Sequence, residues 1–229
     1  MLKLIKSLSK RDFALWMFSA GMILLSSIVF RGSDPLTVAA SLVGVTALIF
    51  IANGNVLGQI LTIVFSIMYA VISYQYRYYG EMITYVGMTL PAAAVATVSW
   101  LRHPYDGAAE VEVAQLGKIH RITLPLTAVA ATVIFYFILK YFNTANLVIS
   151  TISITTSFAA CYLLIFRSPF YAVAYAANDI VLIALWILAA IDNIAYVPMV
   201  ICFAMFLIND LYGFSNWRRM KQRQEENPV

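Results

Sequence analysis

Eight separate apolar runs, each about long enough to cross a bilayer as a helix, constrain this chain more than any other feature. A transmembrane helix needs roughly 17 to 25 mostly apolar residues. Of the 229 residues, 62% are hydrophobic and only 11% are charged, whereas soluble domains average about 25% charged residues. The sequence therefore predicts an all-α integral membrane protein with eight transmembrane helices. The runs cover residues 13–30, 36–51, 55–76, 81–101, 122–142, 147–166, 170–191 and 196–212.

Lysine and arginine indicate how these helices are oriented. Eight spans place both termini on one side of the membrane, and twelve basic residues fall on that side against three on the other. Since cytoplasmic loops carry an excess of Lys and Arg, we expect both termini to be cytoplasmic. The twelve are Lys3, Lys6, Lys10, Arg11, Arg102, Lys118, Arg121, Arg167, Arg218, Arg219, Lys221 and Arg223, and the three are Arg31, Arg77 and Lys140.

The first run admits a second interpretation, because a basic start followed by an apolar segment is also typical of a signal peptide. This run is long for a signal peptide, and it ends in SSIVFRGSD without a small-x-small cleavage site. We therefore expect a retained first helix.

A shift of 117 positions brings similar residues of the two halves into register. Three helices are an odd number, so one helix between two copies restores the same orientation for both. The sequence therefore predicts a 3+1+3 arrangement of parallel repeats with one extra helix in front, a design in which the substrate site lies between the repeats. The shift pairs Thr62 with Asp179, Tyr69 with Trp186, Tyr79 with Tyr196 and Trp100 with Trp217.

The chain divides accordingly. The polar segment between the repeats contains an EVEV alternation that suggests a short strand or an irregular linker. We expect a cytoplasmic N-terminus with an extra helix in 1–35, a three-helix bundle in 36–101, a cytoplasmic loop in 102–121, a connecting helix in 122–145, a second three-helix bundle in 146–212 and a cytoplasmic basic tail in 213–229.

A polar stripe runs along the otherwise apolar third run. Its members recur at alternating spacings of four and three, which places them on one face of a helix. Lipid gives no reason for such a stripe, so the face should meet other helices, either as hydrogen-bonding packing or as a wall of a substrate path. The stripe consists of Asn55, Gln59, Thr62, Ser66, Tyr69 and Ser73.

The seventh run, with the sequence AANDIVLIALW, holds the strongest candidates for a binding site. Asp179 lies about ten residues into the run, and an ionisable residue at that depth indicates a functional site. Asn178 and Trp186 share one helix face. An amide beside an indole suits a flat heteroaromatic ligand, and a cationic ligand would be attracted to Asp179 as well. The alternative is a structural carboxylate paired with a hydroxyl or an arginine.

The eighth and fourth runs add further candidates. In FLINDLYGFSNWRR, Asn209 is expected to reach the pore, whereas Asp210 is expected to be a solvated cap near the cytoplasmic end. The fourth run has a mixed polar face beside Pro91, an expected kink, and this face could pack against helices or contact the ligand. It is formed by Thr84, Tyr85, Met88 and Thr89.

Several kinds of site are missing from the sequence. It contains no phosphate-binding glycine loop, HExxH motif, nucleophile elbow or carboxylate pair, so we expect neither an enzyme nor a cofactor. His103 and His120 lack further ligands at metal-binding spacing, and Cys161 and Cys202 suit small buried hydrophobes. Topology explains the net charge of +4, so we expect membrane lipid and a small molecule as partners, and no nucleic acid.

With these residues identified, the chain resembles the nicotinamide riboside transporter family, the PnuC-type proteins related to SWEET sugar transporters. The similarity covers about residues 40–220 and is strongest in NDIVLIALW, around Tyr196 and in NDLYGFSNWRR, with YYGEMITY and SWLRHP also alike. The resemblance implies a 3+1+3 fold, often homotrimeric, in the bacterial inner membrane. It further implies facilitated diffusion of nicotinamide riboside or a related vitamin or nucleoside, which cytoplasmic phosphorylation then traps.

By position, the resemblance implies a substrate-facing role for Asn178, Asp179, Trp186 and Asn209. One departure bears on the substrate, because many family members end the fourth helix with a YGWxxW stretch whereas this chain reads PAAAVATVSW and keeps only Trp100. A deoxynucleoside or a vitamin such as thiamin is therefore a further candidate. The candidate substrate-binding residues are Asn178, Asp179, Trp186, Asn209, Gln59, Thr62, Tyr85 and Thr89.

Four hypotheses about function remain open beside the leading one of a passive nicotinamide riboside carrier. The first is a carrier with another nucleoside or vitamin as its substrate. The second is a substrate-binding subunit of an ATP-driven importer, which would need another subunit to hydrolyse ATP. The third is a proton-coupled transporter that uses Asp179, and the fourth is a membrane scaffold without transport activity.

Overall fold

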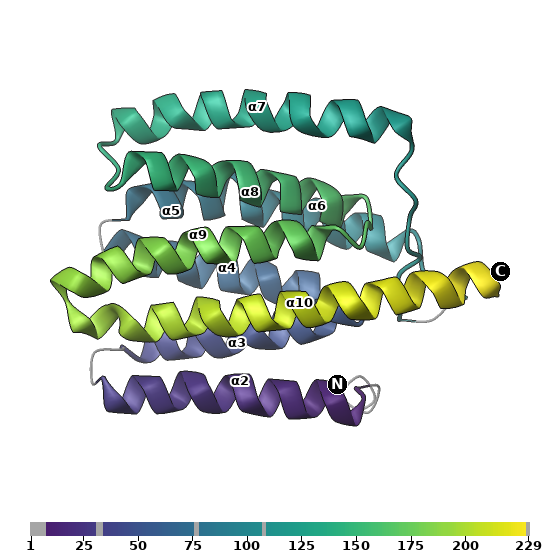
Figure 1. Ribbon diagram of the computed structural model, residues 1–229, viewed down its shortest axis with the longest axis horizontal. Coiled ribbons are helices and arrows are strands. Elements are labelled where there is room, and N and C mark those ends of the chain that lie inside the picture. The colour runs from purple at the N-terminus through teal and green to yellow at the C-terminus, as the bar shows by residue number, and fades with distance from the viewer. Residues whose placement is uncertain (1–7, 31–33, 76–77, 107–108, 228–229) are drawn as a thin grey trace.

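A computed structural model describes residues 8–30, 34–75, 78–106 and 109–227 of this chain. Within those ranges, eight helical spans are long and apolar enough to cross a membrane, as the sequence predicts. Figure 1 shows the spans side by side as one bundle. Helix α2 begins and helix α10 ends at the same end of this bundle, which we call the terminal end, and the other is the distal end.

The first two helices begin at caps that the sequence encodes. Helix α2 (Lys10–Val29) follows Ser9, which accepts from the Asp12 backbone N–H, while the Asp12 carboxylate accepts from the Ser9 backbone N–H. Helix α3 (Pro35–Ala52) follows Asp34, whose carboxylate accepts from the Thr37 backbone N–H. Such reciprocal side-chain contacts satisfy the unpaired donors of a helix N-terminus.

The next two spans show where the expected kink lies. Helix α4 (Leu57–Gln75) is continuous, but the fourth span is α5 (Tyr79–Thr84), the π-helix η1 (Tyr85–Thr89) and α6 (Leu90–Leu101). Pro91 is the second residue after the end of η1. Proline cannot donate a backbone hydrogen bond, and the helix takes up one wider turn just before it, a feature that is frequent at functional sites.

The second half of the chain contains the remaining four spans. Helices α7 (Lys118–Tyr141), α8 (Leu147–Ile165) and α9 (Tyr171–Asp192) lie close to the expected ranges. The short 3-10 helix η2 (Ile194–Tyr196) leads into α10 (Val197–Glu226). Helix α10 has 30 residues, about 45 Å at roughly 1.5 Å per residue. The helix therefore continues far beyond residue 212, through the basic tail.

The two three-helix units meet in the core of the bundle. Helices α3, α4 and α5 to α6 form one unit, and α8, α9 and α10 form the other, with α3 packed directly against α10. Helices α2 and α7 lie at opposite edges of the bundle (Figure 1). This arrangement is the 3+1+3 fold with an extra N-terminal helix, as the sequence predicts.

At the terminal end, each unit binds the other in an equivalent way. Helices α3 and α8 both end in a turn with a left-handed residue, Gly54 with φ 63° and Arg167 with φ 55°. The indole N–H of Trp217 donates to the Ile51 carbonyl oxygen over 2.8 Å. In the other unit, the indole N–H of Trp100 donates to the Leu164 carbonyl oxygen over 3.1 Å. The last helix of each unit thus donates a hydrogen bond to a carbonyl group at the end of the first helix of the other unit.

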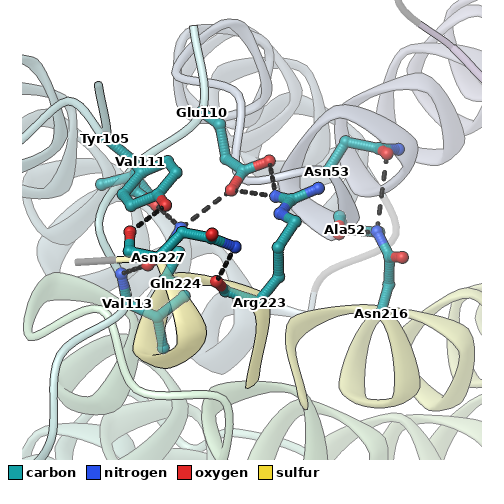
Figure 2. Close-up of polar contacts among 10 residues, drawn as sticks. All are labelled: Ala52, Asn53, Tyr105, Glu110, Val111, Val113, Asn216, Arg223, Gln224 and Asn227. Atoms are coloured by element: carbon teal, nitrogen blue, oxygen red, sulfur yellow. Dashed lines mark hydrogen bonds and ion pairs between the residues drawn. The ribbon is translucent and has the colours of Figure 1, made fainter. Parts of the chain in front are cut away.

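The neighbouring residues repeat this exchange. Asn216, next to Trp217, donates from Nδ2 to the Ala52 carbonyl oxygen over 2.8 Å, as Figure 2 shows. Ser99, next to Trp100, donates from Oγ to the Ile165 carbonyl oxygen over 2.9 Å. The 117-residue repeat is therefore visible in side-chain contacts as well as in helix order.

The polar segment 102–117 crosses the terminal end and contacts both units. Its described residues, 102–106 and 109–117, form only isolated bridges, between Asn55 and Glu110 and between Pro104 and Val111, so an irregular linker is the better description. The Val111 backbone N–H donates to Gly54, and the Ala114 backbone N–H donates to Arg167. We call residues 109–114 the strap.

The end of α10 holds the strap in place, as Figure 2 shows. Gln224 accepts from the Val113 backbone N–H over 2.8 Å and donates to Glu110 and to the Val111 carbonyl oxygen. Arg223 pairs with Glu110 in the same place. The extension of α10 beyond residue 212 is what brings these two side chains to the strap.

The basic residues lie where the charge pattern predicts. Ten of the eleven described Lys and Arg residues are at the terminal end, and Lys140 is at the distal end. Lys3, Lys6, Arg31 and Arg77, which also enter the charge comparison, lie outside the described residues.

Candidate substrate cavity

A cavity inside the bundle is lined by both three-helix units. Its volume is about 50 Å³, enough for a few water molecules but far too little for a nucleoside. The first unit contributes Gly44, Ala47, Leu48 and Ile51 from α3, Thr62 and Phe65 from α4, and Tyr85 and Thr89 from η1. The second contributes Ser157 from α8, Tyr171, Tyr175, Asn178 and Asp179 from α9, and Phe206 and Asp210 from α10.

The cavity brings together five of the eight residues proposed from the sequence. Thr62, Tyr85, Thr89, Asn178 and Asp179 all line it. They come from three spans that are distant in the chain, and η1 places both Tyr85 and Thr89 on the cavity wall. The other three candidates, Gln59, Trp186 and Asn209, do not line the cavity.

Asn178 is held by helix α8. Its side-chain oxygen accepts from Thr156 Oγ1 over 2.9 Å and from Ser153 Oγ over 3.2 Å. These two bonds use both lone pairs of the amide oxygen and fix the orientation of the amide. The Nδ2 group is therefore the part of the side chain that is suited to a ligand.

Asp179 and Asp210 form a pair of buried carboxyl groups. They are 4% and 3% exposed, line the same cavity and lie close enough to interact with each other. Asp179 Oδ2 has no hydrogen-bond partner among the described residues. In lipid surroundings an unpaired acidic oxygen is costly, so this atom is a candidate ligand group.

Two expectations about acidic residues were wrong here. Asp210 is not a solvated helix cap, because α10 continues for four more turns and keeps this residue inside the bundle. The absence of a carboxylate pair was also wrong, since Asp179 and Asp210 belong to different helices and meet only in the folded chain. No spacing motif within one segment could have revealed that pair.

Trp186 lies outside the cavity lining, two turns toward the distal end from Asp179. Its side chain is fully buried, and the indole N–H donates to the Tyr69 hydroxyl over 3.0 Å. The rings of Tyr78 and Tyr196 pack beside it, with centroids 5.1 Å and 6.0 Å away. In this conformation Trp186 belongs to an aromatic cluster between the cavity and the distal end.

Asn209 also lies apart from the cavity lining. Its Nδ2 group donates to Ser19 Oγ of α2 over 2.9 Å and to the Met205 carbonyl oxygen over 2.7 Å. This residue therefore joins the extra helix α2 to α10. Its neighbour Asp210, about 100° further round the helix, occupies the cavity position instead.

The polar stripe of α4 faces the interior of the bundle, as expected, since Gln59, Ser66, Tyr69 and Ser73 are all buried. Ser66 and Thr62 donate to carbonyl groups one turn earlier in their own helix. Both polar atoms of the Gln59 side chain lack a partner among the described residues. Gln59 is not part of the cavity lining, but its amide is available for hydrogen bonds if the helices move.

Glu81 of α5 is a buried acidic residue that sequence reasoning missed. It is 1% exposed, and neither carboxylate oxygen has a hydrogen-bond partner among the described residues. Glu81 lies one turn before Tyr85, toward the distal end. The rule that selected Asp179, an ionisable group inside an apolar run, is harder to apply to Glu81, which is the first residue of its run.

Comparisons with known proteins agree with this architecture. The family model of the nicotinamide mononucleotide transporters matches residues 34–219. The nicotinamide riboside transporter PnuC of Neisseria mucosa is 24% identical over 200 residues, which cover 85% of this chain and 76% of that protein. A crystal structure of the vitamin B3 transporter PnuC superposes with a TM-score of 0.82 at 22% identity, with 94% of each chain covered.

The matched proteins are transporters and not enzymes. This agrees with the expectation drawn from the sequence, which lacks the catalytic and nucleotide-binding motifs named above. The family model spans most of the chain, from the cap of α3 to the polar part of α10. It therefore covers every residue that lines the cavity. The chain, a multi-pass membrane protein, belongs to the nicotinamide mononucleotide transporter family, the PnuC-type carriers.

Proposed function

We propose that this protein carries nicotinamide riboside across the bacterial inner membrane by facilitated diffusion. The observation that carries the proposal is the cavity between the two repeats, lined by an amide, two carboxyl groups and several aromatic rings. The Neisseria mucosa relative is a nicotinamide riboside transporter, which supports this choice of substrate.

The chemistry of the cavity suits a nucleoside with a flat ring. Phe65, Tyr85 and Phe206 line the cavity and offer ring faces for stacking. Asn178 has a donor group suited to a carboxamide or a ribose hydroxyl, and the Asp179 carboxyl group lines the same space. Trp186 and Asn209 stay proposed contacts for a conformation in which the helices have moved.

Alternating access is supported by closure on both sides of the cavity. The strap and the two tryptophans Trp100 and Trp217 cover the terminal side. The cluster around Trp186 and Tyr69 covers the distal side. A cavity of about 50 Å³ cannot hold the substrate, so binding requires separation of helices at one end, and the two ends would open in turn.

Passive transport equalises concentrations and cannot by itself accumulate the substrate. We infer that a cytoplasmic kinase phosphorylates the riboside, which adds negative charge and removes it from the pool of transportable molecules. No described feature of this chain resembles a nucleotide-binding loop, in line with a carrier that leaves this step to another enzyme.

Orientation and assembly complete the proposal. The excess of Lys and Arg at the terminal end supports cytoplasmic termini.

Helix α7 packs chiefly on α8 and exposes an apolar stripe that suits lipid or a neighbouring chain, and we propose a homotrimer. Light scattering in detergent should give three times the chain mass of 25.5 kDa. The stripe contains Ile122, Leu126, Val129, Val133 and Phe137.

Calorimetry on the purified, detergent-solubilised protein tests the substrate. Nicotinamide riboside should bind saturably, whereas nicotinamide mononucleotide should not, because its phosphate adds negative charge to a cavity that already holds Asp179 and Asp210. Deoxynucleosides and thiamin are titrated alongside. Binding of one of these alone would replace the substrate, and co-purification with an ATPase would support an ATP-driven importer instead.

A further inference from the structure

The pair Asp179 and Asp210 has no positive partner in the part of the chain that the structure describes. The described ion pairs join Lys221 to Glu225 and Arg223 to Glu110, both at the terminal end. The described Lys and Arg residues lie at the two ends of the bundle and not beside the cavity. Two acidic groups are thus buried together in a membrane protein without a compensating cation.

Comparison with Asp12 separates this pair from an ordinary structural carboxylate. Asp12 is also buried, at 1% exposed, but it accepts from the Tyr212 hydroxyl over 2.6 Å and from the Ser9 backbone N–H over 2.7 Å. Asp179 is as well buried, yet its Oδ2 atom accepts from no described group. A buried acidic oxygen without a partner in a membrane-spanning helix points to a functional site, at which a ligand can supply the partner.

The other side chains of the cavity narrow the kind of ligand. Aromatic rings of Phe65, Tyr85 and Phe206 line the same space as the two carboxyl groups. Ring faces and carboxylates both attract positive charge, and rings favour flat, delocalised cations over compact, strongly hydrated ones. This combination differs from a site for a neutral nucleoside, which needs hydrogen bonds but no negative charge.

We propose that Asp179, together with Asp210, recognises the positive charge of a flat aromatic cation, and so determines specificity for cationic over neutral ring systems. The inference rests on the proposed function, because the pyridinium ring of nicotinamide riboside carries such a charge. It goes further in assigning the discrimination to charge and to these two residues. Neutral nucleosides of similar size are then poor ligands even where they fit.

Reduced nicotinamide riboside provides the test, since its dihydropyridine ring is neutral and nearly the same in shape. The full-length protein in detergent is titrated by calorimetry with the oxidised and the reduced riboside. The wild type should bind the cation about tenfold or more tightly, and Asp179→Asn should lose about tenfold or more in affinity for the cation. Affinity for the neutral form should change by less than about threefold.

Asp192 provides a matched control, because it is an exposed carboxylate at the distal end of the same helix. Asp192→Asn should leave both affinities unchanged. Asp210→Asn is the second variant and should also reduce the preference for the cation. Should one variant fail to fold, the other still tests the assignment to these residues, and the preference of the wild type tests the assignment to charge.

Equal affinity of the wild type for the two ribosides would overturn the charge assignment and leave the proposed function intact. Retention of the full preference in both Asp179→Asn and Asp210→Asn would overturn the assignment to these residues. Binding of neither riboside would refute the proposed substrate. In that case thiamin, a cation, and uridine, which is neutral, allow the same comparison of charge, and a preference for uridine would contradict the inference.

Discussion

Trp100 and Trp217, 117 positions apart, pack their rings together at the terminal end with centroids 5.4 Å apart. Each indole N–H donates to a carbonyl group of the opposite repeat, Trp100 to Leu164 and Trp217 to Ile51. The two repeats are therefore joined by a symmetric exchange of hydrogen bonds. Any motion that opens the terminal side must break or carry along these contacts.

The Trp217 contact makes a prediction about stability. Trp217→Phe keeps an aromatic ring but removes one of two donors to the Ile51 carbonyl, which still accepts from the Gly54 backbone N–H. The loss of one hydrogen bond should lower the free energy of unfolding by about 0.5–1.5 kcal/mol. The measurement is the unfolding transition in detergent. Trp16→Phe is the control, because Trp16 is only half-buried and donates to the hydroxyl of Thr46. This variant should lower the free energy of unfolding by less than Trp217→Phe does.

Asn178 and Asn209 should behave differently although both are buried amides in adjacent helices. Asn178→Ala removes a cavity residue and should weaken substrate binding by about tenfold or more. Asn209→Ala breaks the contact to Ser19 and should lower the thermal stability, with a smaller loss of affinity than in Asn178→Ala. Calorimetry and thermal unfolding on the same samples separate the two effects. A loss of affinity in Asn209→Ala as large as that in Asn178→Ala would mean that this residue moves into the site.

The hydrogen bond between Trp186 and Tyr69 can be tested by removing its two partners in turn. Tyr69→Phe removes the hydroxyl that accepts from the indole N–H and should cost about 1–3 kcal/mol in the free energy of unfolding. The double variant with Trp186→Phe should cost less than the sum of the two single variants, because both remove the same bond. Unfolding of the two single variants and the double variant measures this coupling. If Trp186 also contacts the substrate, only Trp186→Phe should reduce affinity.

At the strap, burial predicts which contact of α10 matters more. Arg223 is largely exposed where it pairs with Glu110, and exposed ion pairs contribute about 0–1 kcal/mol. Gln224 is 9% exposed and bonds Glu110, Val111 and Val113. Gln224→Ala should therefore reduce the unfolding midpoint more than Arg223→Ala does. The reverse order would show that the ion pair holds the strap.

The helices were predictable from the sequence because bilayer thickness fixes their length and their composition. The repeat was also predictable, since Tyr69 and Trp186, or Trp100 and Trp217, keep equivalent places over 117 positions. The caps of α2 and α3 likewise depend on residues within one turn. All of these signals are local or periodic.

Much of the site was less predictable, because it depends on which face of each helix turns inward. Asn209 and Asp210 are neighbours in the chain but point about 100° apart on a helix, and no local pattern shows how the helix is rotated in the bundle. Asp210 is buried because α10 continues beyond residue 212, which the sequence analysis did not predict. Trp186 is fully buried in the bundle, yet its partner is Tyr69 and it does not line the cavity.

Uptake by proteoliposomes tests the central claim most directly. The purified chain alone, reconstituted without an ion gradient or ATP, is supplied with labelled nicotinamide riboside. The account predicts saturable uptake that stops when the internal concentration equals the external one, and continued accumulation when a riboside kinase and ATP are enclosed. Absence of uptake would contradict a passive carrier. So would accumulation above the external concentration when a proton gradient is imposed, if that accumulation is lost in Asp179→Asn.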